Sequence, residues 1–175
     1  MKNLELKAHC PDLETAYRIA EAIGARFQWT QEQCDIYWQV PLGKLKLRRQ
    51  AGQAAQLIAY HRPQNPESKL SHYQIVETAD EDHLKAVLSL VLPIDVQICK
   101  IRTLFLWNHV RIHLDQVRLL GDFVEFEAML DEQNPIEQAE RDLMFLQERF
   151  SIVAEDLVEC GYYELLCALR GREIA

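Results

Sequence analysis

The stretch from Val110 to Glu127 constrains the fold of this chain more than any other. Apolar and polar residues alternate strictly in two runs, Val110 to Asp115 and Phe123 to Glu127, and the segment between them contains Gly121 and Asp122. Alternation with a period of two is typical of β-strands. Two such runs joined through a glycine predict an antiparallel β-hairpin with a longer loop.

The two faces of this predicted hairpin differ in chemistry, because successive side chains point to opposite faces of a strand. One face is apolar and carries Val110, Ile112, Leu114, Val124 and Phe126. The other face is ionisable and carries Arg111, His113, Asp115, Glu125 and Glu127. The polar face of an antiparallel sheet commonly faces water, but acids and bases on one face also form a candidate metal and anion site.

The same spacing recurs in three other predicted strands. Their polar side chains two residues apart are Asn3, Glu5 and Lys7; Lys44, Lys46 and Arg48; and Lys100 and Arg102. In an open sheet these side chains would lie on a solvated face, whereas in a closed sheet they would line an internal channel. Like charges inside a channel require counter-ions, so a channel implies a phosphate-rich anion together with a divalent metal. Periodicity alone leaves both alternatives open.

Composition places the chain among globular proteins and limits its partners. Its 175 residues, of which 49% are hydrophobic, suit a single domain over residues 1–175 with a sizeable core. The formal net charge of -8 opposes non-specific binding to nucleic acid or to an anionic membrane. Any anionic ligand must therefore be held by a local cluster of cations.

The cysteines and the N-terminal residues favour a cytoplasmic protein. The five cysteines are scattered and form no C-x-x-C pair, which predicts reduced thiols rather than a disulfide framework or a zinc site. The N-terminal residues contain no apolar signal segment, and the apolar stretch from Leu84 to Ile98 is interrupted by Pro93 and Asp95. We therefore expect neither a signal peptide nor a membrane span.

Strand and helix patterns follow one another along the chain and predict an α+β fold. Besides the hairpin, strands are expected at residues 4–8, 25–40, 44–48, 56–61, 71–77 and 94–106. Helices are expected at residues 11–22, 80–92, 135–149 and 154–169, the last with a break at Gly161. Residues 64–69 are expected to form a polar loop.

Several different short motifs follow one another along nearly the whole chain. The first is Asn3-Leu4-Glu5-Leu6-Lys7, and the later ones are Asp35 to Tyr37, Leu45 to Arg48, Tyr60 to Pro63, Lys100 to Arg102, Arg111 to Asp115 and Leu120 to Glu127. In order and spacing they resemble the CYTH superfamily, the triphosphate tunnel metalloenzymes, whose name joins class IV adenylate cyclases and thiamine triphosphatases. The first motif is similar to the E-x-E-x-K signature of that family, with Asn3 in place of the first glutamate.

The resemblance implies a closed eight-stranded antiparallel β tunnel with a charged interior, packed by helices, which binds a triphosphate with Mg²⁺ or Mn²⁺. The implied metal ligands are Glu5, Asp115, Glu125 and Glu127, and the implied catalytic residues are Glu5, Glu125 and Glu127. The implied phosphate-binding residues are Lys7, Lys46, Arg48, Arg62, Lys100, Arg102 and Arg111. Secondary candidates are Lys44, Lys69 and His113. These residue types suit the ligands, since Lys and Arg neutralise phosphoryl oxygens and carboxylates supply hard oxygen ligands.

Three functions are compatible with such a site. Triphosphate hydrolysis ranks first, and a class IV adenylate cyclase that makes cyclic AMP and pyrophosphate from ATP is the first alternative. Because Asn3 brings no charge to a position where the family has a carboxylate, a non-catalytic polyphosphate-binding module is the second alternative. The expected substrates are tripolyphosphate, thiamine triphosphate or ATP, and a homodimer remains open.

Overall fold

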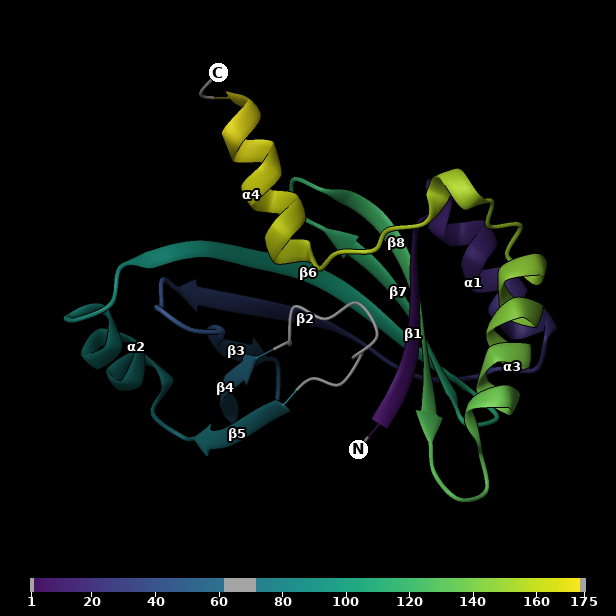
Figure 1. Ribbon diagram of the computed structural model, residues 1–175, viewed down its shortest axis with the longest axis horizontal. Coiled ribbons are helices and arrows are strands. Elements are labelled where there is room, and N and C mark those ends of the chain that lie inside the picture. Colours follow the sequence, from purple (N-terminus) through teal and green to yellow (C-terminus); the bar gives the residue numbers. More distant parts are fainter. Residues whose placement is uncertain (1, 62–71, 174–175) are drawn as a thin grey trace. The chain divides into compact units, whose positions relative to one another are not determined.

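The computed structural model describes residues 2–61 and 72–173 of the chain (Figure 1). The elements in order are β1 (Lys2–His9), α1 (Leu13–Ala22), β2 (Arg26–Trp38), β3 (Lys44–Gln50), β4 (Ala55–His61), β5 (His72–Thr78), α2 (Glu81–Ser89), β6 (Ile94–Trp107), β7 (Val110–Val117), β8 (Gly121–Leu130), α3 (Ile136–Arg149), the 3₁₀ helix η1 (Ala154–Asp156) and α4 (Tyr162–Glu173). The predicted strands and the first three predicted helices are therefore present. The polar loop predicted at residues 64–69 lies outside the described residues.

All eight strands belong to one sheet, in the order β1-β8-β7-β6-β2-β3-β4-β5. The predicted α+β class and the eight antiparallel strands are confirmed. In the predicted hairpin, Ile112 of β7 lies opposite Phe126 of β8, as the alternation requires. The strands β1 and β5 are the two edges, so backbone hydrogen bonds between the described strands do not close the sheet into a ring.

Contacts between residues divide the chain into two compact units. Unit 1 consists of Met1–Gln31 and Lys100–Leu165, and unit 2 consists of Glu32–Cys99 and Leu166–Ala175. The long strands β2 and β6 each contribute residues to both units. Each unit has its own buried apolar cluster, and each cluster lies beneath a helix.

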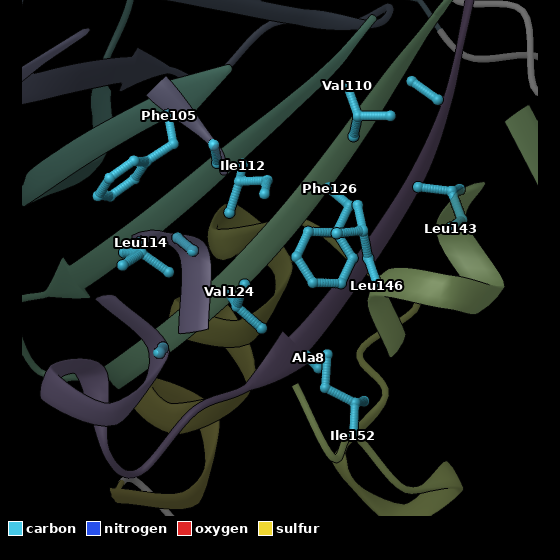
Figure 2. Packing of buried hydrophobic residues seen from close by; sticks show 14 of the residues in the cluster. Ala8, Phe105, Val110, Ile112, Leu114, Val124, Phe126, Leu143, Leu146 and Ile152 are labelled. Atoms are coloured by element: carbon cyan, nitrogen blue, oxygen red, sulfur yellow. The ribbon is translucent and has the colours of Figure 1, made fainter. Parts of the chain in front are cut away.

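The core of unit 1 lies on the apolar face of β7 and β8, which α1 and α3 cover. Figure 2 shows Ile112 of β7 beside Phe126 of β8, with Leu146 of α3 packed next to the phenyl ring. These three side chains are 0% exposed, and burial of a side chain of this size contributes about 1.5–3 kcal/mol. Because helices occupy this face, the ionisable side chains of the same strands lie on the opposite one.

The chain after α3 differs from the helix predicted for residues 154–169. Of the described residues after α3, Ala154–Asp156 and Tyr162–Glu173 are helical. Between them, Leu157 forms an antiparallel bridge with Ala8, and the Val158 amide donates to the Lys7 carbonyl over 2.9 Å. Pairing with β1 replaces helical hydrogen bonds and covers part of the outer edge of that strand. No helix in the described ranges is both long and apolar enough to span a membrane.

The core of unit 2 lies between α2 and the strands β2 and β3. Ile36, Trp38 and Leu47 are buried there, packed against Leu84 and Leu88 of α2. The indole nitrogen of Trp38 donates to the hydroxyl of Ser89 over 3.1 Å. Since side chains alternate along a strand, the polar neighbours of these apolar residues lie on the other face of β2 and β3.

The prediction that all five cysteines are reduced thiols is wrong for two of them. Cys34 of β2 and Cys99 of β6 form a disulfide, with their Cα atoms 4.1 Å apart. The strands β2 and β6 are neighbours in the sheet, so residues that are 65 positions apart in sequence lie side by side. Sequence spacing cannot reveal such a long-range pair. Cys10, Cys160 and Cys167 are free thiols.

Candidate functional site

Four consecutive strands of unit 1 place their ionisable side chains on one face of the sheet. The side chains are Glu5, Lys7, Lys100, Arg102, Arg111, His113, Asp115, Glu125 and Glu127. The strand registers bring them into cross-strand contact, because Glu125 of β8 lies opposite both Lys7 of β1 and His113 of β7. Arg102 of β6 lies opposite Asp115 of β7. The parity expected from the sequence is thus present in this unit.

Asp115 is the centre of this group, and its side chain is 0% exposed. Its Oδ1 atom accepts a hydrogen bond from Arg102 Nε over 2.6 Å. Its Oδ2 atom accepts from Arg102 Nη2 (2.5 Å), Lys100 Nζ (2.9 Å) and the Tyr162 hydroxyl (2.8 Å). Four donors therefore occupy the lone pairs that a carboxylate offers. The sequence predicts Asp115 as a metal ligand, and in this structure its oxygens accept hydrogen bonds from protein donors, two of them cationic side chains.

Around Asp115, the attraction between opposite charges affects the pKa values more than burial does. Burial by itself would raise the pKa of Asp115, but Arg102 and Lys100 hold that pKa well below its usual range. Burial would likewise lower the pKa of Arg102, but Asp115 and Glu125 raise it above its usual value. Both side chains therefore stay ionised at neutral pH. Removing either one would leave a buried charge without its counter-ion.

Glu125 extends the cluster towards β1. Its Oε2 atom lies 3.2 Å from Arg102 Nη2 and 3.6 Å from Lys7 Nζ. Burial would raise the pKa of Glu125, but Arg102 and Lys7 lower it to about 2. His113 Nδ1 lies 3.9 Å from Glu125 Oε1, which is too long for a hydrogen bond. Burial and Arg102 lower the pKa of His113 to about 3, so the neutral imidazole forms no ion pair with Glu125.

Glu5 and Glu127 form a second group on the same face of unit 1. They lie directly opposite each other across the β1–β8 ladder, an arrangement in which two carboxylates repel. The side-chain nitrogen of Asn3 donates to Oε1 of Glu5 over 2.9 Å and to Oε1 of Glu127 over 2.6 Å. Arg111 Nη1 donates to Oε2 of Glu127 over 3.1 Å. An uncharged amide thus bridges two carboxylates that together would attract a cation.

The second group fits a divalent cation that takes only two ligands from the protein. Mg²⁺ is usually held by one or two carboxylates together with water and substrate phosphates. Glu5 and Glu127 supply such a pair, and Asn3 adds an amide where a further carboxylate would be a stronger ligand. Across residues 2–61 and 72–173, no group of three or more His, Cys, Asp and Glu side chains could hold a metal by itself. A metal at this pair must therefore draw its other ligands from water or phosphate.

Unit 2 contains another buried aspartate that binds two cations. Asp35 of β2 is 7% exposed. Its Oδ1 accepts from Arg48 Nε, and its Oδ2 accepts from Arg48 Nη2 and from Lys46 Nζ, each over 2.8 Å. Burial would raise the pKa of Asp35, but Lys46 and Arg48 hold that pKa well below its usual range. Lys46 Nζ also lies 5.5 Å from the centre of the Tyr37 ring.

The aspartate clusters of the two units use the same atoms. In each, a Lys-x-Arg pair on one strand binds an aspartate on the neighbouring strand, and the arginine pairs Nε with Oδ1 and Nη2 with Oδ2. In each, the lysine ammonium binds Oδ2. Bidentate pairing fixes the plane of the guanidinium group. Each aspartate thus holds two cations in place, and in unit 1 Arg102 also pairs with Glu125.

Sequence reasoning missed the role of two residues in these clusters. Tyr162 was assigned to an apolar helix, and no periodic signal points to it because it reaches the cluster from outside the strands. Asp35 was noted only as part of a motif. Its position between Cys34 and Ile36, in a strand whose outer face is apolar, was a usable signal of an inward-facing acid. Of the predicted phosphate-binding residues, Arg62 lies outside the described part of the chain, as does the secondary candidate Lys69.

Comparisons with known proteins place the chain in a family. A family model described as the CYTH domain matches residues 1–162. A comparison with curated proteins found no match. The PH1012 protein from Pyrococcus horikoshii is 22% identical, with a TM-score of 0.79 over 94% of this chain and 99% of that one.

Two further solved structures share the fold. A proposed adenylate cyclase from Vibrio parahaemolyticus is 21% identical, with a TM-score of 0.75 over 94% of this chain and 97% of that one. A proposed adenylyl cyclase from Hippeastrum with a dominant triphosphatase activity is 13% identical, with a TM-score of 0.70 over 96% of each chain. At these identities the likeness shows the fold and not the activity. The family model nevertheless spans most of the sequence, and the chain belongs to the CYTH domain family.

Proposed function

We propose that this protein binds a triphosphate and hydrolyses it in a reaction that depends on a divalent metal. The observation that carries the proposal is the buried Asp115 cluster, which fixes Lys100 and Arg102 on the same face of unit 1 as the opposed carboxylates Glu5 and Glu127. Fixed cations suit phosphoryl oxygens, and opposed carboxylates suit Mg²⁺ or Mn²⁺. The dominant triphosphatase activity of the similar Hippeastrum protein supports hydrolysis ahead of cyclisation.

Phosphate binding is the role of the cationic side chains in this proposal. In unit 1 they are Lys7, Lys100, Arg102 and Arg111, and in unit 2 they are Lys46 and Arg48, while Arg62 lies outside the described residues. Asp115 holds Lys100 and Arg102 in position before any anion arrives, so less side-chain entropy is lost on binding. Preorganised donors also stabilise the charge that develops on the departing diphosphate.

Metal binding is the role of Glu5 and Glu127 in this proposal. A metal held there would neutralise phosphate charge and would favour ionisation of a water molecule. Asp115, expected as a ligand, serves instead as the anchor of two cations. Glu125, expected as both ligand and catalytic residue, has a pKa of about 2 and therefore donates no proton at neutral pH. Glu125 keeps a negative charge beside Lys7 and Arg102, which limits how tightly the product is retained.

A non-catalytic phosphate-binding module is the second candidate, and the bridging amide of Asn3 favours it. Asn3 already donates to Oε1 of Glu5 and to Oε1 of Glu127, so a metal that binds both of these oxygens must displace the amide nitrogen. If that displacement is too costly, the cations still bind a triphosphate but turnover is lost.

An assay panel tests the proposal. The purified chain is incubated with tripolyphosphate, thiamine triphosphate or ATP, with Mg²⁺ or Mn²⁺ and with EDTA, and phosphate, cyclic AMP and bound ligand are measured. Metal-dependent phosphate release that Lys100→Met abolishes and Arg118→Met preserves supports hydrolysis, since Arg118 is exposed and outside both clusters. Cyclic AMP production would identify a cyclase. Tight binding with no turnover would identify a binding module.

A further inference from the structure

Tyr162 contacts the unit 1 cluster in two chemically different ways. It is the first residue of α4 and is 9% exposed. Its hydroxyl donates to Oδ2 of Asp115 over 2.8 Å. Its ring lies under two ammonium groups, with Lys7 Nζ 4.4 Å and Lys100 Nζ 4.9 Å from the ring centre. The rings of Tyr162 and Phe123 also pack edge to face, with their centres 5.0 Å apart.

The two lysines come from strands that are not neighbours. Lys7 belongs to β1 and Lys100 to β6, and both β8 and β7 lie between these strands in the sheet. A flexible lysine ammonium is not oriented by its backbone, whereas an aromatic face attracts and localises it. Asp115 binds Lys100 and Glu125 lies near Lys7, and one tyrosine ring contacts both ammonium groups across the two intervening strands.

We propose that Tyr162 is a positioning residue for anion binding, which uses its ring to align the ammonium groups of Lys7 and Lys100 and its hydroxyl to orient Asp115. The first turn of α4 thereby completes the cationic part of the site. The assignment of an anion to these lysines rests on the proposed function, while the alignment of the lysines does not. Burial and the charge of Asp115 raise the pKa of Tyr162, so its hydroxyl is a neutral donor at neutral pH.

Three variants separate the ring from the hydroxyl. Tyr162→Phe keeps the ring and loses the hydroxyl, Tyr162→Leu loses both, and Tyr163→Leu removes the adjacent tyrosine of α4 as a matched control. We expect Tyr162→Leu to raise the dissociation constant for tripolyphosphate about tenfold, and Tyr162→Phe to change it less than threefold. In turnover, Tyr162→Leu should raise KM about tenfold and change kcat less than threefold. Tyr163→Leu should leave both constants near wild type.

A direct measurement of the lysines keeps the test independent of turnover. In NMR spectra of the lysine ammonium groups, ring currents of Tyr162 should displace the Lys7 and Lys100 signals, and Tyr162→Leu but not Tyr162→Phe should abolish the displacement. If Tyr162→Leu does not fold, Tyr162→Met is the substitute.

Unchanged lysine signals in the Leu or Met variant overturn the proposal. The proposal is also overturned if that variant keeps the wild-type affinity for tripolyphosphate and only its melting temperature falls. A wild-type chain that binds no tripolyphosphate contradicts the proposed function, and the lysine signals then decide the alignment alone.

Discussion

Asn3 donates its side-chain amide to Oε1 of Glu127 across the β1–β8 pair, over 2.6 Å. The same nitrogen reaches Oε1 of Glu5 over 2.9 Å, so one neutral group reduces the repulsion between two opposed carboxylates. The departure from the E-x-E-x-K pattern at position 3 therefore has a structural consequence, because an uncharged hydrogen-bond donor stands where that pattern has a carboxylate. The pair is held together without a metal, and metal binding must compete with that amide.

Restoring a carboxylate at position 3 should strengthen metal binding. Asn3→Glu removes the competing donor and adds a hard oxygen ligand, so we expect the dissociation constant for Mn²⁺ to fall about tenfold. Calorimetric titration with Mn²⁺ and Mg²⁺ measures the change. Gln116→Glu, which adds the same charge on the opposite face of β7, is the matched control. Equal metal affinity in wild type and Asn3→Glu would exclude a metal-site role for position 3.

Removing the opposed carboxylates should abolish the metal requirement without weakening the fold. Glu5→Gln combined with Glu127→Gln deletes the proposed ligands and their mutual repulsion, so the melting temperature in EDTA should not fall. Activity should drop to the level that wild type shows in EDTA. Glu132→Gln, on the exposed segment before α3, serves as the control and should behave as wild type. Full metal-dependent activity in the double variant would show that the ligands lie elsewhere.

Neutralising the central aspartate should cost much more stability than neutralising a surface one. Asp115→Asn leaves Lys100 and Arg102 buried without a counter-ion, and we expect a loss of about 3–5 kcal/mol in the free energy of unfolding. Urea denaturation followed by circular dichroism measures it. Asp82→Asn, an exposed position in α2, should change stability by less than about 0.5 kcal/mol. A loss for Asp115→Asn as small as that of Asp82→Asn would contradict the assigned role.

The buried neutral imidazole of His113 should make the fold sensitive to mild acid. Its pKa is about 3 in the folded protein against 6.5 for an ordinary histidine, because burial and the Arg102 and Lys100 cations oppose protonation more strongly than Glu125 and Asp115 favour it. Between pH 3 and 6.5 the unfolded chain binds more protons than the folded protein. The stability that the neutral His113 contributes is therefore complete above pH 6.5 and is lost as pH falls towards 3. The expected slope is about 1.4 kcal/mol per pH unit.

Urea unfolding in EDTA at several values between pH 7.5 and 4.5 tests this slope. His113→Gln should flatten the profile. The slopes are compared, and not the free energies of unfolding at one pH, because the substitution also changes packing. His83→Gln, at an exposed position of α2, should retain the wild-type slope. Parallel profiles for wild type and His113→Gln would show that folding does not lower the pKa of His113.

The Cys34–Cys99 disulfide should stabilise the fold under oxidising conditions. It closes a loop between residues 65 positions apart, and removing a crosslink of that span costs about 2–4 kcal/mol. Cys34→Ser, or reduction of the wild type, should lower the melting temperature accordingly, while Cys160→Ser should not. Alkylation of the unreduced, denatured protein should label three of the five cysteines. Labelling of all five would mean that the pair is not bonded.

Strand alternation was sufficient to predict the hairpin and the ionisable face in unit 1. Ile112 and Arg111 fall on opposite faces as expected, because a packed helix layer leaves only one register that buries the apolar set. Two long-range contacts could not be predicted from the sequence. The disulfide and the Tyr162–Asp115 hydrogen bond join residues that are distant in sequence, and no local pattern encodes either. The tail was predicted as helix from its composition, whereas pairing with β1 overrides helix propensity at residues 157–158.

The pairing of Leu157 and Val158 with β1 also determines how far the chain can be shortened. An exposed strand edge readily recruits a strand from another molecule. A truncated version that ends before Leu157 would uncover the backbone of Lys7 and Ala8 and should self-associate through that edge. A version that keeps Leu157 and Val158 retains this cover of β1, so expression boundaries for solution work belong beyond residue 158 rather than at the end of α3.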